Sequence, residues 1–315
     1  MRSADFCELD DVALISFAGE DAVSFLHAQL TSDVAALGAL KTQYSGYCSP
    51  KGRLLATFLL WRLRGDTAEE VVLQLPAALR ESVQNRLARY VLRSRVKVTD
   101  ATSRYRLYGL DGKDSREAIE AIGLRAPASD HDVAAHPELR VTQLQGDRHL
   151  LLADVERADA LLASLESVAT RQDRGHWAAL DVAAGIPVIT EATQEAYVPQ
   201  MVNLDLIGGV SYAKGCYPGQ EIVARTHYLG KLKQRMYRIG VRNVETLSAG
   251  QSLYSPEFGA DQASGAILYT APRTGELHEA LAVVQRSSVE GRSVRLGALD
   301  GSAVEFLPLP YTLPD

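Results

Sequence analysis

The side chains best suited to chemistry lie close together, in residues 214–225 of the 315-residue chain. This stretch holds a thiol, Cys216, beside one glycine, with a proline and a second glycine just downstream. Proline suits the first turn of a helix, and glycine suits the left-handed residue that follows a helix end. We therefore expect a tight loop through the thiol, a helix over residues 218–229, and Gly230 as the left-handed residue after it.

Cys216 has two interpretations on these residues alone. A helix N-terminus on one side and Lys214 on the other both favour the thiolate, which makes this thiol a candidate reactive group. The alternative is that Cys216 is a small buried apolar residue and that the glycines only shape the turn. Whether the thiol is accessible separates the two interpretations.

The string Lys-Gly-Cys-Tyr-Pro-Gly-Gln-Glu at residues 214–221, followed by a short apolar run and an arginine, resembles the signature of the YgfZ family of folate-binding proteins. A first helix, a first hairpin and two later stretches of that family are also similar to this chain, at residues 25–34, 47–53, 185–187 and 198–204. The resemblance spans residues 11–233, and its specificity is concentrated in the signature.

The resemblance carries expectations about fold, cofactor and partners. The family is related to the T-protein of the glycine cleavage system, an aminomethyltransferase, and is linked to the assembly or repair of iron–sulfur clusters. This implies an α+β fold, in which two ferredoxin-like units and a C-terminal small β-barrel form a ring with a central folate pocket. It also implies tetrahydrofolate or a derivative as cofactor, and iron–sulfur client or assembly proteins as partners.

The resemblance also points to the residues of a folate site, with Cys216 as the reactive thiol. The hairpin offers Lys51 and Arg53, whose charges suit the carboxylates of a folate. The signature offers a second group, which consists of Lys214, Tyr217, Gln220, Glu221 and Arg225. For Glu221 a structural role is also open, because a carboxylate in the first turn of a helix complements its dipole.

Two acidic groups of the T-protein relatives have no counterpart here. One follows the hairpin turn, where residues 49–57 hold no Asp or Glu, and the other precedes a glycine equivalent to Gly185, where this chain has Ala183 and Ala184. Their loss removes a proton acceptor and the partner of a pterin amino group. We therefore favour a folate-binding accessory factor for iron–sulfur enzymes, including tRNA-modifying ones, over a folate-dependent one-carbon transferase or demethylase.

A basic band within residues 80–106 supports a third interpretation. Only Glu81 and Asp100 oppose its cations, which are Arg80, Arg86, Arg89, Arg93, Arg95, Lys97, Arg104 and Arg106. The simpler interpretation is a solvated helix face. The functional one is an anionic site, either for a folate's glutamate tail or for an RNA backbone in a weak contact with tRNA.

Composition narrows the class of protein further. A net charge of −6 disfavours a general nucleic-acid or anionic-membrane binder, and three separated cysteines indicate a reducing compartment. The acidic N-terminus has no leader character, so the cytoplasm is the expected location. Dinucleotide-binding, P-loop, zinc-protease and serine-hydrolase motifs are all missing. No metal site is predicted, because His131 and His136 lie on an expected loop without a nearby cysteine.

The pattern of elements changes near residue 230. Before it, strand and helix signals alternate, which indicates an α+β region of two interleaved subdomains over residues 1–230. Expected helices include one that starts at residues 19–21 and contains Leu30, and one over residues 76–92; residues 123–137 are expected to form a loop. After residue 230, short apolar segments separated by Gly, Pro and Asp indicate an all-β barrel-like domain over residues 231–315. These segments are residues 233–241, 251–255, 265–270, 279–284, 293–296 and 304–307.

Overall fold

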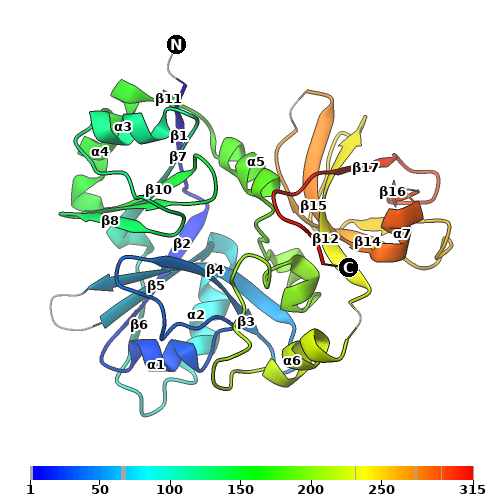
Figure 1. Ribbon diagram of the computed structural model, residues 1–315, viewed down its shortest axis with the longest axis horizontal. Coiled ribbons are helices and arrows are strands. Elements are labelled where there is room, and N and C mark those ends of the chain that lie inside the picture. Colours follow the sequence, from blue (N-terminus) through cyan, green and yellow to red (C-terminus); the bar gives the residue numbers. More distant parts are fainter. Residues whose placement is uncertain (1–2, 65–68, 231, 274, 292, 315) are drawn as a thin grey trace. The chain divides into compact units, whose positions relative to one another are not determined.

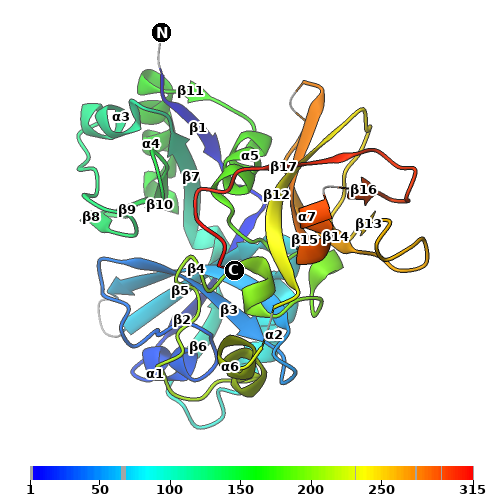
Figure 2. The same cartoon turned by 45° about the vertical axis from the view of Figure 1, so that its right-hand side comes forward.

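Two structural units interleave along this chain. The computed structural model describes residues 3–64, 69–230, 232–273, 275–291 and 293–314, and Figures 1 and 2 show its helices and strands. The first unit comprises Met1–His27, Asp33–Gln43 and Phe58–Trp177. The second comprises Ala28–Ser32, Tyr44–Thr57 and Ala178–Asp315.

The first unit contains a six-stranded sheet in the order β11-β1-β7-β10-β9-β8 (Figures 1 and 2). Its strands are β1 (Asp5–Glu8), β7 (Tyr105–Asp111), β8 (Val133–His136), β9 (Leu139–Gln143), β10 (His149–Asp154) and β11 (Thr170–Arg171). Side chains alternate between the two faces of a strand. Phe6 and Leu110 therefore share the face that forms a buried core with α3 (Ser115–Ala121) and α4 (Val155–Val168). Asp5 and Asp111 lie on the opposite face.

A five-stranded sheet has the order β3-β4-β5-β2-β6. Its strands are β2 (Val12–Ala18), β3 (Thr42–Cys48), β4 (Leu54–Arg64), β5 (Glu69–Pro76) and β6 (Lys97–Asp100). Val71, Val72 and Leu73 are consecutive and all fully buried, so both faces of β5 are shielded from water. Helix α1 (Ala22–His27) packs against β5, and α2 (Arg80–Ala88) packs against β2 and β6.

The C-terminal sheet confirms the predicted strand segments. Its order is β16-β13-β14-β15-β12-β17, and all its pairs are antiparallel, in a curled half-barrel. The strands are β12 (Gln234–Arg242), β13 (Ser252–Tyr254), β14 (Gly265–Thr270), β15 (Leu277–Gln285), β16 (Arg295–Leu296) and β17 (Val304–Leu307). Ile239, Ile267 and Ala282 are fully buried members of its core. One short helix, α7 (Arg286–Gly291), was not expected.

Several expected boundaries need correction. Helix α1 ends at His27, and Leu30 instead forms an isolated antiparallel bridge with Tyr47. The helix expected over residues 76–92 is a 3-10 turn (Ala77–Leu79) followed by α2, which ends at Ala88. The loop expected over residues 123–137 contains strand β8, because Glu138 adopts a left-handed conformation (φ 57°) that turns the chain back into β9.

The predicted division between residues 230 and 231 stays a prediction. Residue 231 lies outside the described residues, and the second unit combines the C-terminal sheet with residues 178–230. Among the helices that the structure describes, none has the length and apolar character needed to cross a membrane.

Candidate functional site

The hairpin between β3 and β4 forms the predicted turn. Gly52 N donates a hydrogen bond to Ser49 O (2.9 Å), and Ser49 N donates to Arg53 O (2.8 Å). Gly52 is left-handed, with φ of 69°. This is the pattern of a three-residue hairpin loop, in which a turn is followed by a left-handed residue. The tip therefore holds Lys51 at the surface and its glycine underneath.

The signature loop packs directly on this hairpin tip through two glycines. A Cβ added to Gly219, which has φ of 81°, would lie 2.5 Å from Ser49 O and 2.6 Å from the Cα of Gly52. A Cβ added to Gly52 would lie 2.9 Å from the Cβ of Ile222. Only residues without a side chain allow two backbones to approach this closely. Hairpin and signature, far apart in the sequence, therefore form one local structure within the second unit.

Gly219 also sets where the helix begins. It is the N-cap of α6 (Gln220–Tyr228), so this helix starts two residues later than expected. The left-handed conformation belongs to Gly219, whereas Gly230 has no positive φ, which corrects the predicted helix end. Pro218 consequently lies in the loop before the helix.

Lys214 is an anchor of the loop. Its side chain is buried, and Nζ donates hydrogen bonds to Leu30 O (2.6 Å) and Ser32 O (3.0 Å). The ammonium also lies 5.1 Å from the centre of the Tyr217 ring, within the range of a cation–π contact. Lys214 therefore fixes the loop from its buried side. Its expected effect on the thiol of Cys216 stays a prediction.

The side chain of Lys214 reaches a buried polar network that no local sequence pattern indicates. Thr31 Oγ1 donates to Gly209 O (2.6 Å) and accepts from Gly46 N (2.8 Å), while Ser32 Oγ donates to Ser45 Oγ (2.8 Å). Buried hydroxyls of this kind are stable only when they are hydrogen-bonded. The segment around Thr31 therefore joins strand β3, the Gly209 turn and Lys214.

Cys216 is exposed, as is Gly215 beside it, and these two residues lie between the buried side chains of Lys214 and Tyr217. Tyr217 is buried, and burial raises the pKa of its hydroxyl. Gln220 closes the loop through long hydrogen bonds from Nε2 to Lys214 O and Gly215 O (both 3.5 Å). Cys216 is thus the exposed thiol, whereas Cys7 and Cys48 are both buried. The interpretation of Cys216 as a small buried residue is wrong.

Cys48 lies in the same local structure but has the opposite character. It is fully buried at the end of β3, and burial raises the pKa of its thiol to about 12. A thiol with such a pKa stays protonated at neutral pH and is a poor nucleophile. Of the two thiols in this local structure, Cys216 is therefore the accessible one.

The remaining predicted residues around the loop differ in how exposed they are. Lys51, Glu221 and Arg225 are exposed, and Glu221 lies in the first turn of α6 as expected. Arg53 is half-buried, and its guanidinium donates to Ala196 O, so part of its role is structural. Glu221 is the one carboxylate of the hairpin tip and signature, residues 48–53 and 214–225.

Residues 198–205 contact helix α6 and bind it through a hydrogen bond. Gln200 Nε2 donates to Val223 O (2.7 Å), and the buried Arg235 donates from Nη1 to Gln200 O (2.9 Å). The same guanidinium pairs with Asp205 (2.9 Å). A buried ion pair with further hydrogen bonds fixes local geometry. The helix that follows Cys216 is therefore rigidly placed within its unit.

An aromatic group that no local sequence pattern indicates lies at the C-terminal end of α6. The rings of Tyr212 and His227 stack at 3.7 Å, and Tyr228 meets both edge-on. Burial and the charge of Asp205 raise the pKa of Tyr212 to about 12. Tyr228 is 66% exposed and offers an aromatic surface to solvent. The sequence does not reveal this stacking, because Tyr212 lies outside α6 and meets His227 only in the folded chain.

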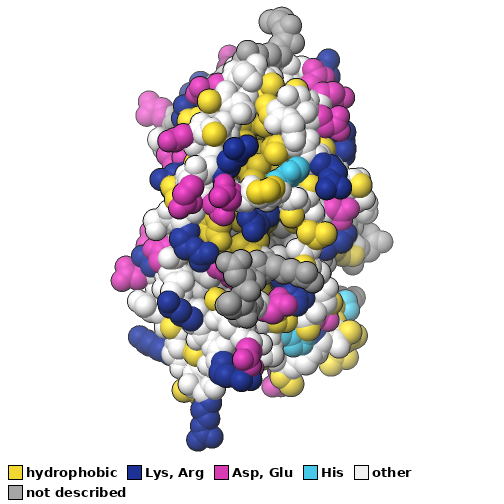
Figure 3. All heavy atoms as spheres, turned by 90° about the vertical axis from the view of Figure 1, so that its left-hand side faces the viewer, with side chains coloured by type: hydrophobic (Ala, Val, Ile, Leu, Met, Phe, Trp, Pro, Cys, Tyr) yellow, Lys and Arg dark blue, Asp and Glu magenta, His cyan; other side chains and the backbone are white. Residues whose placement is uncertain are grey.

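Among the residues that the structure describes, four of the eight cations of the basic band form ion pairs with acids of the first unit. Arg80 pairs with Asp100, while Arg95, Arg104 and Arg106 pair with Glu20, Glu70 and Glu8. Figure 3 shows one face of the molecule, on which basic and acidic side chains are intermixed. These ion pairs favour a solvated surface over a continuous site that binds anions.

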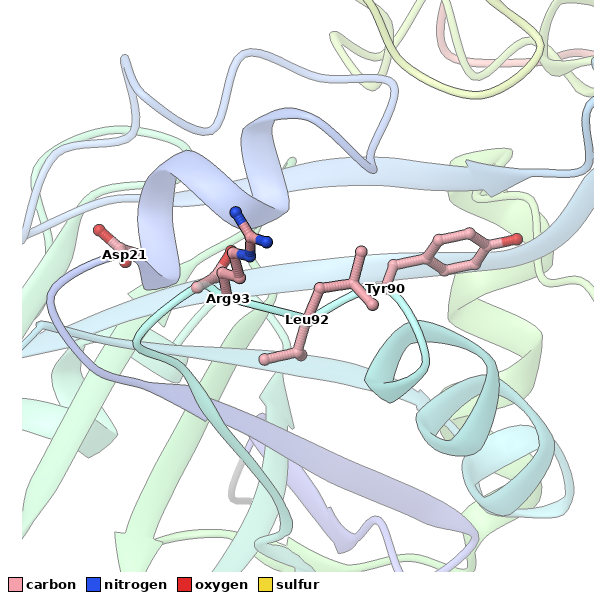
Figure 4. A pocket seen from close by; sticks show the side chains of 6 residues that line it. Asp21, Tyr90, Leu92 and Arg93 are labelled. Carbon is pink, nitrogen blue, oxygen red and sulfur yellow. The ribbon is translucent and has the colours of Figure 1, made fainter.

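One part of the band borders a hollow of about 820 Å³. Figure 4 shows this loop after α2, with Tyr90, Leu92 and Arg93 on it and Asp21 nearby. Leu92 is 86% exposed and left-handed, with φ of 43°. The hollow is wide and shallow, and it lies in the first unit, so it is not part of the hairpin and signature structure.

Replacement of Lys214 by methionine is expected to lower the free energy of unfolding by about 2–4 kcal/mol. The substitution leaves Leu30 O and Ser32 O buried without their charged donor. Urea unfolding of the full chain measures the change. The exposed Lys51→Met variant is the control and is expected to stay within about 0.5 kcal/mol of the unmodified protein. Equal stability of both variants would show that other groups satisfy the two carbonyls.

Comparison with known proteins identifies the fold and the family of this chain. No protein-family model matches the chain. The fold is similar to that of the glycine cleavage system aminomethyltransferase T from Bartonella henselae, with a TM-score of 0.78 and 18% identity over 98% of this chain and 86% of that one. The predicted α+β fold of the T-protein type is therefore confirmed.

A relative with higher identity is the tRNA-modifying protein YgfZ of Yersinia pseudotuberculosis serotype O:1b (strain IP 31758). It is 31% identical over 247 residues, which cover 78% of this chain and 73% of the relative. The chain belongs to the YgfZ family.

Proposed function

We propose that this protein binds a reduced folate and serves as an accessory factor for iron–sulfur enzymes, including tRNA-modifying ones. The observation that carries the proposal is the exposed Cys216, held between the anchored Lys214 and the buried Tyr217 beside the hairpin tip. The Yersinia relative is named as a tRNA-modifying protein, and the proposal extends that context to the present chain. The expected location remains the cytoplasm.

The residues around the loop fit a folate. Lys51 and Arg225 are exposed cations, and no ion pair occupies either of them among the described residues, so both are available to the glutamate carboxylates. The amide of Gln220 and the loop carbonyls match the hydrogen-bonding edge of a pterin. A bound reduced folate would supply one-carbon carrier chemistry. The chain itself would contribute orientation and the thiol of Cys216.

Tetrahydrofolate is expected to bind the purified protein saturably, as calorimetry under anaerobic conditions measures. Reversal of charge at Lys51 and Arg53 is expected to weaken binding by about tenfold for each lost charged contact. Lys51→Glu alone is the cleaner variant, because Arg53 also holds Ala196 O. Lys113→Glu, an exposed lysine of the first unit, is the control and is expected to keep full affinity. No saturable binding at the highest soluble folate concentration would overturn the proposal.

The alternative activity is a folate-dependent one-carbon transferase or demethylase. Catalysis of that kind needs a proton acceptor at the pterin, and the hairpin and signature offer only the exposed Glu221. Consumption or release of formaldehyde in the presence of tetrahydrofolate separates the two functions. An accessory factor is expected to bind the folate with no turnover, whereas catalytic turnover that is lost in Glu221→Gln supports the alternative.

A further inference from the structure

A second cluster of ligand-type side chains lies in the first unit. Asp5 on β1 and Asp111 on β7 are direct cross-strand partners on the sheet face opposite the core. His176, in the first turn of α5 (Arg174–Ala184), places Nε2 at 2.8 Å from Asp111 Oδ1. One oxygen or nitrogen atom from each of the three residues lies within 4.8 Å of the others. Three potential ligands from three elements thus meet at one point.

The carboxylates of Asp5 and Asp111 face each other, and the basic side chain beside them is that of His176. Like charges directly opposite each other on a sheet are unfavourable. The nearby cations are engaged with other acids: Arg171 with Glu8 and Glu166, and Arg174 with Asp11. Among the described residues, no lysine or arginine forms an ion pair with Asp5 or Asp111. Other acidic side chains of similar burial in the chain, such as Glu70 and Asp205, each pair with an arginine.

The three groups are also held in place without an ion. Gln172 Nε2 donates to Asp5 Oδ1 (2.8 Å), which orients that carboxylate. Asp173 accepts from His176 N (3.2 Å), as a helix-capping side chain does. Trp177 packs on Gly109, where an added Cβ would lie 2.2 Å from the indole ring. The start of α5 is therefore fixed against β7, and His176 with it.

We propose that Asp5, Asp111 and His176 bind a divalent transition-metal ion, with two carboxylate oxygens and one imidazole nitrogen as protein ligands. Two carboxylates balance the charge of a dication, and imidazole favours Zn²⁺, Co²⁺ or Ni²⁺ over Mg²⁺ or Ca²⁺. The ion replaces the hydrogen bond between His176 and Asp111 and leaves further coordination positions to water. It joins β1, β7 and the start of α5, which gives it a structural role.

Equilibrium dialysis of the full chain against Co²⁺ and Zn²⁺ tests the proposal. A Cys216→Ser background removes the exposed thiol as a competing ligand. One equivalent is expected to bind, with the visible spectrum of Co²⁺ in oxygen and nitrogen ligands and without a thiolate band. Asp5→Asn and His176→Gln are each expected to weaken binding by about tenfold or more. Saturating Zn²⁺ is also expected to raise the thermal midpoint, and this rise is expected to vanish in both variants.

Asp173→Asn is the matched control. This residue adjoins the cluster and lies on the same helix end, and asparagine caps a helix as well as aspartate does. Its variant is expected to keep the affinity for Co²⁺, because Asp173 is not a ligand. An equal loss of affinity in Asp173→Asn and Asp5→Asn would mean that Co²⁺ responds only to the negative charge of this region and not to specific ligands. That outcome, or the absence of stoichiometric binding at millimolar Co²⁺ and Zn²⁺, would overturn the proposal. If His176→Gln unfolds, Asp111→Asn replaces it in the same comparison.

Discussion

Replacement of Gly219 by alanine is expected to lower the free energy of unfolding by about 2–4 kcal/mol and to weaken tetrahydrofolate binding by about tenfold or more. The first cause is conformational, because Gly219 has φ of 81°, which alanine rarely adopts. The second is steric, since the new methyl group meets Ser49 O and the Cα of Gly52 at 2.5 and 2.6 Å. Both of these are backbone atoms that cannot rotate away. The hairpin tip and the signature loop must therefore separate.

A control variant separates the effect of the contact with Ser49 and Gly52 from the effect of the positive φ. Gly259 also has a positive φ (74°), and a Cβ added there meets nothing within 4 Å. Gly259→Ala is expected to cost only about 1 kcal/mol, from backbone strain alone. Urea unfolding measures both variants, and calorimetry measures their folate binding. If both variants lost the same stability and both kept their affinity, the close packing of hairpin on signature would have no energetic importance.

Replacement of Cys216 by serine is expected to abolish support of an iron–sulfur-dependent activity in cells that lack the native protein. The fold should be retained, because serine is nearly isosteric and the side chain is exposed. Complementation is the functional measurement, and unfolding of the purified variant checks that the protein is intact. Full complementation by the Cys216→Ser variant would reduce the signature's role to Lys214 and the backbone of the loop.

Ala213→Ser is the matched control for this variant. It places a serine at an exposed position of the same segment and is expected to complement fully. Alkylation of the folded wild-type chain gives an independent measurement. Cys216 should be the residue modified at neutral pH, because Cys7 and Cys48 are buried and burial raises the pKa of Cys48 to about 12. Modification of Cys48 at a comparable rate would contradict the burial that excludes it.

The C-terminal strands were predictable because each is a short segment of apolar or alternating apolar and polar residues between turns that contain Gly, Pro or Asp. Local sequence determines such strands once a core forms around them. The end of α1 was not predictable in the same way. Leu30 has helical spacing from Leu26, yet its backbone pairs with Tyr47, and a tertiary contact of this kind overrides local propensity. Strand β8 was missed because it is short and its pairing depends on the turn at Glu138.

The sequence predicted which residues form the candidate site better than it predicted what each of them contacts. The glycines of the signature indicated a tight loop, but no local pattern says that Gly219 packs against the Cα of Gly52. Lys214 was expected beside the thiol, whereas its ammonium binds two carbonyls of residues far earlier in the chain. Backbone carbonyls are present at every residue, so the sequence cannot show which of them a buried lysine selects. The cluster of Asp5, Asp111 and His176 was hidden for the same reason, because three distant elements create it.

The interleaving of the two units has a consequence for the chain as it leaves the ribosome. The second unit contains Ala28–Ser32 and Tyr44–Thr57, but its main segment is Ala178–Asp315. Within that segment the hydroxyl of Tyr311 donates a hydrogen bond to Gly185 O. Residues 54–213 must be translated between the hairpin tip and the signature, which takes roughly ten to thirty seconds at about 5–20 residues per second. The hairpin tip therefore waits, already synthesised, for the signature that covers it. Newly made chains should depend on protection by chaperones during that interval, and the thiol of Cys48 should be reactive in them although it is buried in the finished protein.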